Sequence, residues 1–410
     1  MKAAIKRIIQ NTQYENRIIE LSGKNLILVG NNGVGKTRLL NELKKSIEGI
    51  FFHQSYSSTE ELKKQLINQK NALSRCEKDT EEYNSFLNAI IIIEKWLVEK
   101  ESLDIDFMSS SDLISSLKKG VSVFRFFPAD RYYKHSDKNL LTSVESLFQD
   151  FNISGRNRVI TSNFFESYLV SMSNYALLEK GAGEFKEYER VSSVINSITG
   201  DLQELFEDEN LKVEFNRKRL RMELKQENKE TFDLEHLSSG YSSILAIYSE
   251  LIMLAELSST NKSELFGIVI IDEIDAHLHV TLQKKVFDFF SSSFPNIQFI
   301  ISTHSPFVVQ SVSNAIIYNL SLNEQMEDLS IYSYTSIIKG LLGESGNSDG
   351  LVNTLNELNS LIKRRMFNKR FDEILSVLES NFEHLDARAK AVLLNAKSKQ
   401  LDWEDKQDNV

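Results

Sequence analysis

The sequence predicts an α/β protein with buried central strands, a helical insertion and a C-terminal helical extension. Three observations lead to this prediction. An apolar stretch that ends at Gly30 is followed at once by a helical pattern of leucines. Two apolar runs farther along, residues 267–271 and 299–301, have the composition of strands that are buried on both faces. Residues 58–100 and 351–394 are instead charged and helical in pattern.

The composition is that of a globular protein. The chain has 410 residues, of which 41% are hydrophobic and 26% are charged, and this length allows two or three domains with a substantial core. The single cysteine, Cys76, cannot form an internal disulfide, which is consistent with a reducing compartment. The N-terminus lacks the apolar region of a secretion signal, and apolar runs such as residues 86–93 are shorter than the roughly 18 residues of a membrane span. We therefore expect a cytoplasmic protein that does not interact with a membrane.

The charge balance excludes a general attraction to nucleic acid. The formal net charge is -10, the wrong sign for a protein whose whole surface attracts phosphate backbones. Two basic stretches, residues 217–221 and 363–370, are local candidates for such contacts. Because charge runs usually serve solubility, nucleic-acid binding stays open only as a local alternative.

The N-terminal residues predict strands and a first helix. Residues 5–9 and 17–21 are extended in pattern, and residues 25–29 form an apolar strand that is bounded by Gly30. The pattern then becomes helical, with leucines on one face. A strand–loop–helix unit of this kind commonly presents backbone amides to phosphate.

Residues 58–100 predict a helical insertion. Ser58 and Glu61 have the spacing of a capping box, which opens a helix. No glycine or proline marks a turn, so one long helix and a helical hairpin both remain open. Downstream, the patterns predict a strand at residues 121–127, helices over residues 145–205 and a β-hairpin over residues 211–232.

Residues 30–37 match the motif G-x-x-x-x-G-K-[ST], between the predicted strand and helix that this motif requires. Its glycines let backbone amides face phosphate groups, and the following helix adds its positive N-terminal end. We expect Lys36 to bind the β- and γ-phosphates of ATP and the hydroxyl of Thr37 to ligate Mg2+. The residues expected to bind the nucleotide in this loop are Gly30, Asn31, Asn32, Gly33, Val34, Gly35, Lys36, Thr37 and Arg38.

Two acidic residues follow the apolar run at residues 267–271. Consecutive side chains leave a strand on opposite sides, so the two carboxylates can take separate tasks. We expect Asp272 to bind Mg2+ through its water shell and Glu273 to polarise the attacking water. Together with the phosphate loop, this pair indicates phosphoryl-transfer chemistry.

Two further motifs accompany the phosphate loop and the Asp-Glu pair. Residues 237–240 read Leu-Ser-Ser-Gly and open an apolar helical run, and His304 follows the apolar strand at residues 299–301. With the phosphate loop and the Asp-Glu pair, this order resembles that of the ABC ATPase superfamily. The resemblance implies an ATP hydrolase in which His304 contacts the γ-phosphate and acts in catalysis with Glu273 and Lys36.

The same resemblance implies a site that a second copy of the chain completes. Asp275 matches the aspartate that lies at the subunit boundary in this superfamily. Ser238, Ser239 and Gly240 would then face the nucleotide bound by the other subunit, because a hydroxyl and a helix N-terminus supply donors to an anion. We therefore expect a homodimer or a higher even oligomer that binds ATP and Mg2+.

Within the superfamily, the chain is most similar to the RecF-like and OLD-like soluble ATPases, including those of bacterial antiphage systems such as the Septu ATPase. This similarity rests on Phe-Pro-Ala-Asp-Arg at residues 127–131, on the Ser-Ser-Gly signature and on the Thr-His-Ser-Pro sequence around His304. Two residues depart from the pattern, because Tyr241 stands where many relatives have glutamate or glutamine and Val280 where proline is common.

The resemblance also divides the chain and assigns its histidines. The expected parts are an N-terminal lobe of the ATPase domain at residues 1–50, the helical insertion at 51–120, the rest of the ATPase domain at 121–320 and a mainly helical extension at 321–410. His277 and His279 have the spacing of a metal pair, but the superfamily often has Leu-His in this segment, so no metal is expected there.

A nuclease site is not expected in this chain. OLD-type nucleases carry a C-terminal domain with a glutamate and an Asp-x-Asp pair that bind metal. The acidic residues after His304 lack that spacing on an apolar strand. They include Asp349, Asp372, Glu373 and Asp386.

Three classes of function remain. The leading one is a soluble ATPase that gates or assembles a separate effector, such as a nuclease, in antiphage defence. The alternatives are a RecF- or SMC-like repair ATPase that acts directly on DNA and the ATPase subunit of a transporter. The helical insertion and the turn at residues 127–131 disfavour the transporter, which usually has a glutamine-bearing loop sooner after the phosphate loop.

Overall fold

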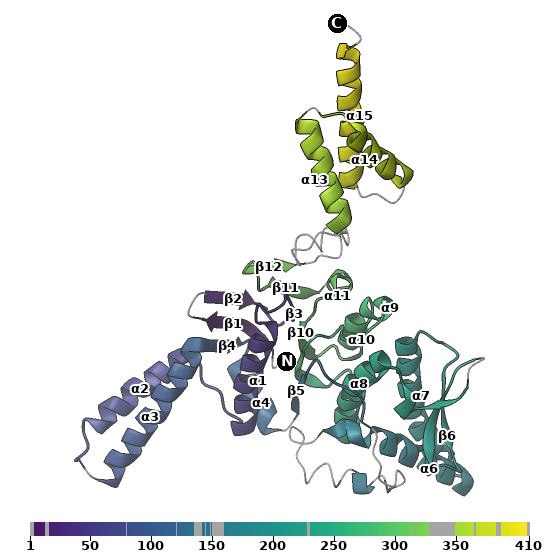
Figure 1. Ribbon diagram of the computed structural model, residues 1–410. Coiled ribbons are helices and arrows are strands. Elements are labelled where there is room, and N and C mark those ends of the chain that lie inside the picture. The colour runs from purple at the N-terminus through teal and green to yellow at the C-terminus, as the bar shows by residue number, and fades with distance from the viewer. Residues whose placement is uncertain are drawn as a thin grey trace. The chain divides into compact units, whose positions relative to one another are not determined.

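The computed structural model divides the chain into two compact units, Met1–Leu342 and Gly343–Val410, and each is described by itself (Figure 1). The structure describes residues 4–12, 16–78, 80–119, 121–134, 142–143, 145–147, 149, 160–227, 230–312, 314–327, 349–364, 366–382 and 387–407. Among the acidic residues named above, Asp386 lies outside these described residues.

The first unit is built on a six-stranded sheet with the order β12-β11-β3-β10-β9-β5. Strands β11, β3, β10, β9 and β5 run parallel to their neighbours, and β12 pairs antiparallel with β11 at one edge. The strands are β3 (Asn25–Val29), β5 (Ser122–Phe127), β9 (Phe266–Ile271), β10 (Ile297–Ser302), β11 (Ala315–Asn319) and β12 (Glu324–Glu327). The predicted α/β class and the buried parallel strands are therefore confirmed.

Register brings the ends of these parallel strands to one edge of the sheet. Ile271, at the end of β9, pairs with Ile301 of β10 and with Phe127 of β5. Ser302, at the end of β10, pairs with Leu28 of β3. In open α/β sheets, ligands bind beyond the carboxyl ends of the strands, so this edge is where a site is expected.

The two faces of the sheet bury separate hydrophobic cores, as expected for strands that alternate their side chains. Leu26 and Leu28 of β3 pack in a core with the apolar face of α1 (Lys36–His53) and with the N-terminal strands. Ile27 and Val29 pack in the other core, together with α8 (Ser239–Leu257). The two layers hold the central strands in place from both sides.

A second sheet of three strands, in the order β2-β1-β4, forms from the N-terminus and from a strand that lies inside residues 51–120, the range of the expected helical insertion. It comprises β1 (Ile5–Asn11), β2 (Asn16–Glu20) and β4 (Leu103–Phe107). The two N-terminal strands were predicted, whereas β4 shows that the chain returns to a sheet sooner than residue 121. Helix α4 (Ser110–Lys118) then leads to β5.

The helical insertion is a hairpin rather than one long helix (Figure 1). Helix α2 (Thr59–Leu73) opens with the predicted capping box, because Ser58 Oγ accepts from the Glu61 amide at 3.2 Å and the Glu61 carboxylate accepts from the Ser58 amide at 2.8 Å. Helix α3 (Glu81–Ser102) starts anew at Thr80, whose hydroxyl accepts from the Tyr83 amide.

A helical lobe covers the face of the sheet that holds α8. Its predicted hairpin is confirmed, with Val213 opposite Leu224 and Phe215 opposite Met222. The lobe comprises η1 (Thr161–Phe164), α6 (Phe165–Ala182), α7 (Phe185–Phe206), β6 (Lys212–Asn216), β7 (Arg221–Lys225), β8 (Phe232–Asp233) and η2 (Leu234–His236). Short helices α9 (Val280–Gln283), α10 (Val286–Ser293) and α11 (Pro306–Gln310) complete the unit.

Helix α8 is longer than the apolar runs, such as residues 86–93, on which the search for membrane spans in the sequence was based. Within the described residues it is the one helix that is long and apolar enough to span a bilayer, by length and composition only. Its apolar window is 83% buried inside the protein, as expected for a core helix. The runs of purely apolar residues missed it because serines, tyrosines and glutamates interrupt it.

The second unit is helical, in line with the pattern seen in the sequence. It contains α13 (Asp349–Lys363), α14 (Lys369–Ser380) and α15 (Ala387–Gln407). Leu358, Phe371 and Leu393 come from the three helices and share one buried core. The unit therefore has a hydrophobic core of its own.

Candidate functional site

The phosphate loop leaves β3 in a strained path that only glycine accepts easily. Gly30, Gly33 and Gly35 have φ angles of 138°, 78° and 103°, in the region that favours glycine. At Gly30 a Cβ atom would lie 2.9 Å from Ser321 Oγ. That hydroxyl accepts a hydrogen bond from the Asn31 amide at 2.9 Å. Ser321, which follows β11, therefore holds the loop and was not predicted.

Lys36 is the first residue of α1 and is only 6% exposed. Its Nζ donates to the carbonyls of Gly30 at 2.8 Å and Asn31 at 3.2 Å, so the ammonium lies inside the loop. Burial lowers the pKa of Lys36, and the carboxylates of Glu273 and Asp272 oppose that shift. The cation and these acidic residues thus share one electrostatic site.

The start of α1 offers further groups to an anion. Its first turn holds no acidic residue and its N-cap, Gly35, provides no side-chain acceptor, so the amides and the helix dipole can stabilise negative charge. Thr37 follows Lys36 in this turn, and Val34 packs against the core on the α1 side of the sheet. Arg38 lies near Glu42, with Nε 3.6 Å from its carboxylate.

Asp272 and Glu273 follow β9, and one serine holds both. The Ser302 hydroxyl donates to Asp272 Oδ1 and accepts from the Glu273 amide at 2.8 Å. Asp272 is 3% exposed and Ser302 is fully buried. Glu273 has a φ of 46° and lies beyond the strand. The expectation that simple strand alternation separates the two carboxylates is therefore wrong, because a left-handed turn separates them.

Asp275 is bonded to Thr303, the residue between the end of β10 and His304. The Thr303 hydroxyl donates to Asp275 Oδ1 at 2.5 Å and accepts from the Ser305 amide at 2.9 Å. Ser305 then caps α11 by accepting from the Phe307 amide at 3.2 Å. His304 lies between two buried residues on this fixed turn and is itself half-buried.

The signature residues open α8. Ser238 is the N-cap without a side-chain cap, and both Ser238 and Ser239 are exposed. Gly240 is buried, and a Cβ atom there would lie 2.8 Å from the His277 carbonyl oxygen. Gly240 therefore has a packing role within its own chain that was not predicted. Tyr241, which departs from the family pattern, stacks on Phe206 with ring centroids 4.3 Å apart.

Arg131 is a further residue of this region whose role the sequence did not predict. It is 7% exposed. Its Nη1 donates to the carbonyls of Asp272 at 2.7 Å and Pro128 at 3.0 Å, and its Nη2 donates to those of Glu273 at 3.1 Å and Ile274 at 3.2 Å. Burial lowers the pKa of Arg131 to about 10, and nearby carboxylates oppose the shift. The guanidinium stays charged at neutral pH.

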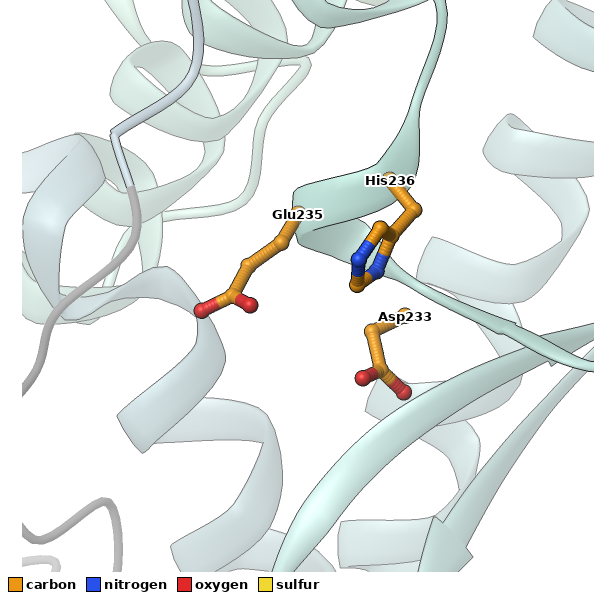
Figure 2. Close-up of side chains that lie close together, drawn as sticks. All are labelled: Asp233, Glu235 and His236. Atoms are coloured by element: carbon orange, nitrogen blue, oxygen red, sulfur yellow. The ribbon is translucent and has the colours of Figure 1, made fainter.

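A separate cluster precedes α8 and has no feature that requires a metal. Figure 2 shows Asp233, Glu235 and His236, whose ligand atoms lie within 4.8 Å of one another. Asp233 is 3.2 Å from Arg219 and Glu235 is 3.1 Å from Arg221. These pairs neutralise part of the basic stretch at residues 217–221, which weakens it as a candidate for nucleic-acid contact.

The chain has recognisable relatives. It is 34% identical over 135 residues to the Septu protein PtuA of Bacillus mycoides (strain KBAB4), which covers 32% of this chain and 19% of that protein. It is 40% identical over 82 residues to the Retron Vc95 probable ATPase of Vibrio cholerae serotype O1 biovar El Tor, covering 19% of this chain and 16% of that protein. The aligned segments therefore span less than a fifth of those relatives.

A solved structure is more distant in sequence. The Smc head domain bound to the C-terminal domain of ScpA, derived from Pyrococcus furiosus, is 13% identical, covers 78% of this chain and 95% of that chain, and has a TM-score of 0.33. Similarity at this level adds nothing to the assignment.

A family model matches residues 26–310, more than half of the chain. This segment runs from β3 through the phosphate loop, the signature, the Asp-Glu pair and His304 to α11. The matched segment therefore includes both the central strands of the α/β sheet and the phosphate loop. The chain belongs to the family described as "AAA domain, putative AbiEii toxin, Type IV TA system".

Proposed function

We propose that the chain hydrolyses ATP with Mg2+ at composite sites between two copies and uses their closure to gate or assemble an effector, a nuclease, in bacterial antiphage defence. The observation that carries this proposal is the position of Lys36. A buried cation inside a glycine loop, within the field of the acidic residues that follow β9, supports phosphoryl transfer.

The donor set fits the nucleotide and its metal. Lys36 and the amides of the loop would bind the phosphates, and the α1 N-terminus would add its dipole. Thr37 and Asp272 offer the oxygen atoms that Mg2+ prefers, and Ser302 holds Asp272 in place. When bound, Mg2+ neutralises charge on the phosphate oxygens.

The remaining side chains have separate tasks in this proposal. Glu273, turned out of the strand by its left-handed backbone, orients the attacking water and accepts its proton. His304 stabilises the γ-phosphate from the neighbouring strand end. Asp275 fixes that turn through Thr303, so the two strand ends act as one rigid edge.

Two features support completion of the site by a second copy. Ser238 and Ser239 are exposed at a helix N-terminus without a side-chain cap. The first turn of α8 contains no acidic residue, so it can receive an anion. Homodimerisation would place each signature against the phosphate loop of the partner.

The role in defence is supported by the similarity to a Septu protein and to a probable retron ATPase. The helical hairpin offers a surface for a partner, because Ile91 is 56% exposed, Trp96 is 45% exposed and Val98 is 64% exposed. This protein would then supply the ATP-driven change while the effector supplies the cutting chemistry.

The experiment that tests the proposal uses Glu273→Gln. The variant keeps Asp272 and the loop, so it is expected to bind ATP, turn it over at least about 100-fold more slowly and accumulate as a dimer. Turnover and light scattering with ATP measure these outcomes. Turnover at the wild-type rate would sink the assignment of Glu273.

A second assay tests whether ATP hydrolysis and DNA cleavage belong to different proteins. The pure protein, incubated with plasmid DNA, ATP and Mg2+ or Mn2+, is expected to hydrolyse ATP and leave the plasmid intact. Metal-dependent cleavage by the protein freed of co-purifying chains would contradict the division of labour and would place a nuclease site in this chain.

A further inference from the structure

Arg131 lies at the end of β5, next to the strand that delivers the two acidic residues. Its guanidinium contacts four backbone carbonyls. Three of them belong to consecutive residues, Asp272, Glu273 and Ile274. A planar fork with several donors restricts the path of such a turn more than a point charge would.

The turn that Arg131 contacts needs restraint. Glu273 has a φ of 46°, a conformation that a residue with a side chain holds only when its surroundings impose it. Ser302 supplies restraint on the amide side, because its hydroxyl accepts from the Glu273 amide and its carbonyl accepts from the Ile274 amide at 3.0 Å. Arg131 supplies restraint on the carbonyl side, so the turn is held from both.

Stabilisation of the fold does not by itself explain why an arginine is buried at position 131. Burying a guanidinium is costly, and apolar residues of similar volume often replace buried charges without loss of stability. Its Nε atom is buried and finds no acceptor among the residues that the structure describes. Because burial of this guanidinium costs free energy, we expect Arg131 to serve the site whose backbone it contacts.

The backbone after Arg131 reaches the signature helix of the same chain. The Tyr133 amide donates to the carbonyl of Ser242 at 3.1 Å and to its hydroxyl at 3.0 Å. Ser242 lies in the first turn of α8, three residues after Ser239. Residues 131–133 therefore connect the turn of Glu273 to the helix that would contact the nucleotide of the partner.

We propose that Arg131 is a positioning residue for ATP hydrolysis, which fixes the direction of the Glu273 carboxylate through the three carbonyls of its turn and links that turn to the start of α8. This proposal rests on the proposed function, because it assumes that Glu273 orients the attacking water. In this proposal Arg131 acts through the backbone carbonyls that it contacts, and not by direct contact with the nucleotide or the water.

The test compares Arg131→Met and Arg131→Lys with a matched control. Arg17→Met removes another buried arginine, 6% exposed, which donates to Gln10 in the N-terminal sheet. We expect Arg131→Met to lower kcat about 100-fold, as small misplacements of reacting groups do, with KM and ATP affinity changed by less than about two-fold. Arg131→Lys should be intermediate, since it keeps the charge but loses the fork.

A further readout separates positioning from general damage. ATP bound per chain and Tm report the folded fraction, and trapping of ADP with aluminium fluoride reports the arrangement that hydrolysis requires. The Arg131 variants should bind ATP fully but trap ADP–aluminium fluoride poorly. Arg17→Met should keep kcat and trapping per folded chain, whatever its Tm.

Each outcome decides the proposal. Wild-type kcat in both Arg131 variants, with Glu273→Gln inactive, overturns the role of Arg131 and leaves the proposed function intact. Wild-type turnover in Glu273→Gln instead refutes the proposed function. If Arg131→Met does not fold, Arg131→Lys decides: a lower kcat at full ATP binding supports the positioning role, and an unchanged kcat or a change in KM alone overturns it.

Discussion

Ser302→Ala is expected to lower both the stability and the turnover of this protein. The Ser302 side chain is fully buried at the end of β10 and bonds two neighbouring residues of β9 and its turn. It donates to the Asp272 carboxylate and accepts from the Glu273 amide. Alanine would leave a buried carboxylate oxygen and a half-buried amide without these partners.

The magnitude follows from these two bonds. A hydrogen bond to a charged group contributes about 1.5–3 kcal/mol, and a buried donor left unsatisfied costs about 1–3 kcal/mol. Because water and small shifts recover part of this loss, we expect the free energy of unfolding to fall by about 2–4 kcal/mol. That corresponds to a Tm about 3–6 °C lower for the main unit, Met1–Leu342, because a unit of this size has a large entropy of unfolding. Turnover should fall about 10–100-fold, as when the group that orients a metal ligand is removed.

Ser122→Ala is the matched control. Ser122 is 2% exposed in β5 of the same sheet, and its hydroxyl has no partner within the part of the chain that the structure describes. Its removal should change Tm and kcat little. Thermal unfolding and steady-state hydrolysis of the two variants, side by side, check the reasoning. Equal Tm and equal kcat for both variants would refute the role assigned to Ser302.

Two further predictions concern buried charges. Lys36→Ala should abolish productive ATP binding while the far-ultraviolet circular dichroism stays that of the wild type, because Lys36 faces the loop; calorimetric titration with unchanged ATP affinity would contradict this. Glu256→Gln should stabilise the protein near pH 8 and not near pH 4. Burial raises the pKa of Glu256 although Tyr168 donates to it at 2.6 Å, so the folded state loses stability as pH rises through that pKa, and protonation at low pH removes the difference. Denaturation at both pH values measures it, and a gain that is equal at both would show that the carboxylate is not responsible.

Much of the fold could be predicted because its strands carry strong local signals. Apolar runs before Gly30 and before Asp272 sufficed for β3 and β9. Strand β4 was missed although Leu103, Ile105 and Phe107 alternate with aspartates, because this short pattern directly follows a long helix. The hairpin of α2 and α3 could not be distinguished from one helix, since its turn contains no glycine or proline.

For the site, the motif residues could be predicted from the sequence, whereas the residues that hold them in place could not. The motifs named the groups that are expected to face a nucleotide, but the residues that hold them come from other strand ends. Ser302 and Ser321 gave no signal of their own, because one polar residue after a strand has many ordinary explanations. Arg131 belonged to a motif that supported the resemblance, but the motif did not indicate which groups its guanidinium contacts. Only the register of the parallel strands brings them to the loop and to Glu273.

The central claim is that two copies of the chain complete each other's ATP sites, and mixing two inactive variants tests it most directly. Lys36→Ala damages the loop, and Ser239→Arg damages the exposed start of α8. In a mixed dimer with composite sites, both lesions fall in one site and the other site is intact. Each variant alone should be inactive, and an equal mixture should regain about one quarter of the wild-type ATPase rate, since half of the dimers are mixed and each has one working site. A mixture as inactive as its components, beside an active wild-type protein, would contradict the account.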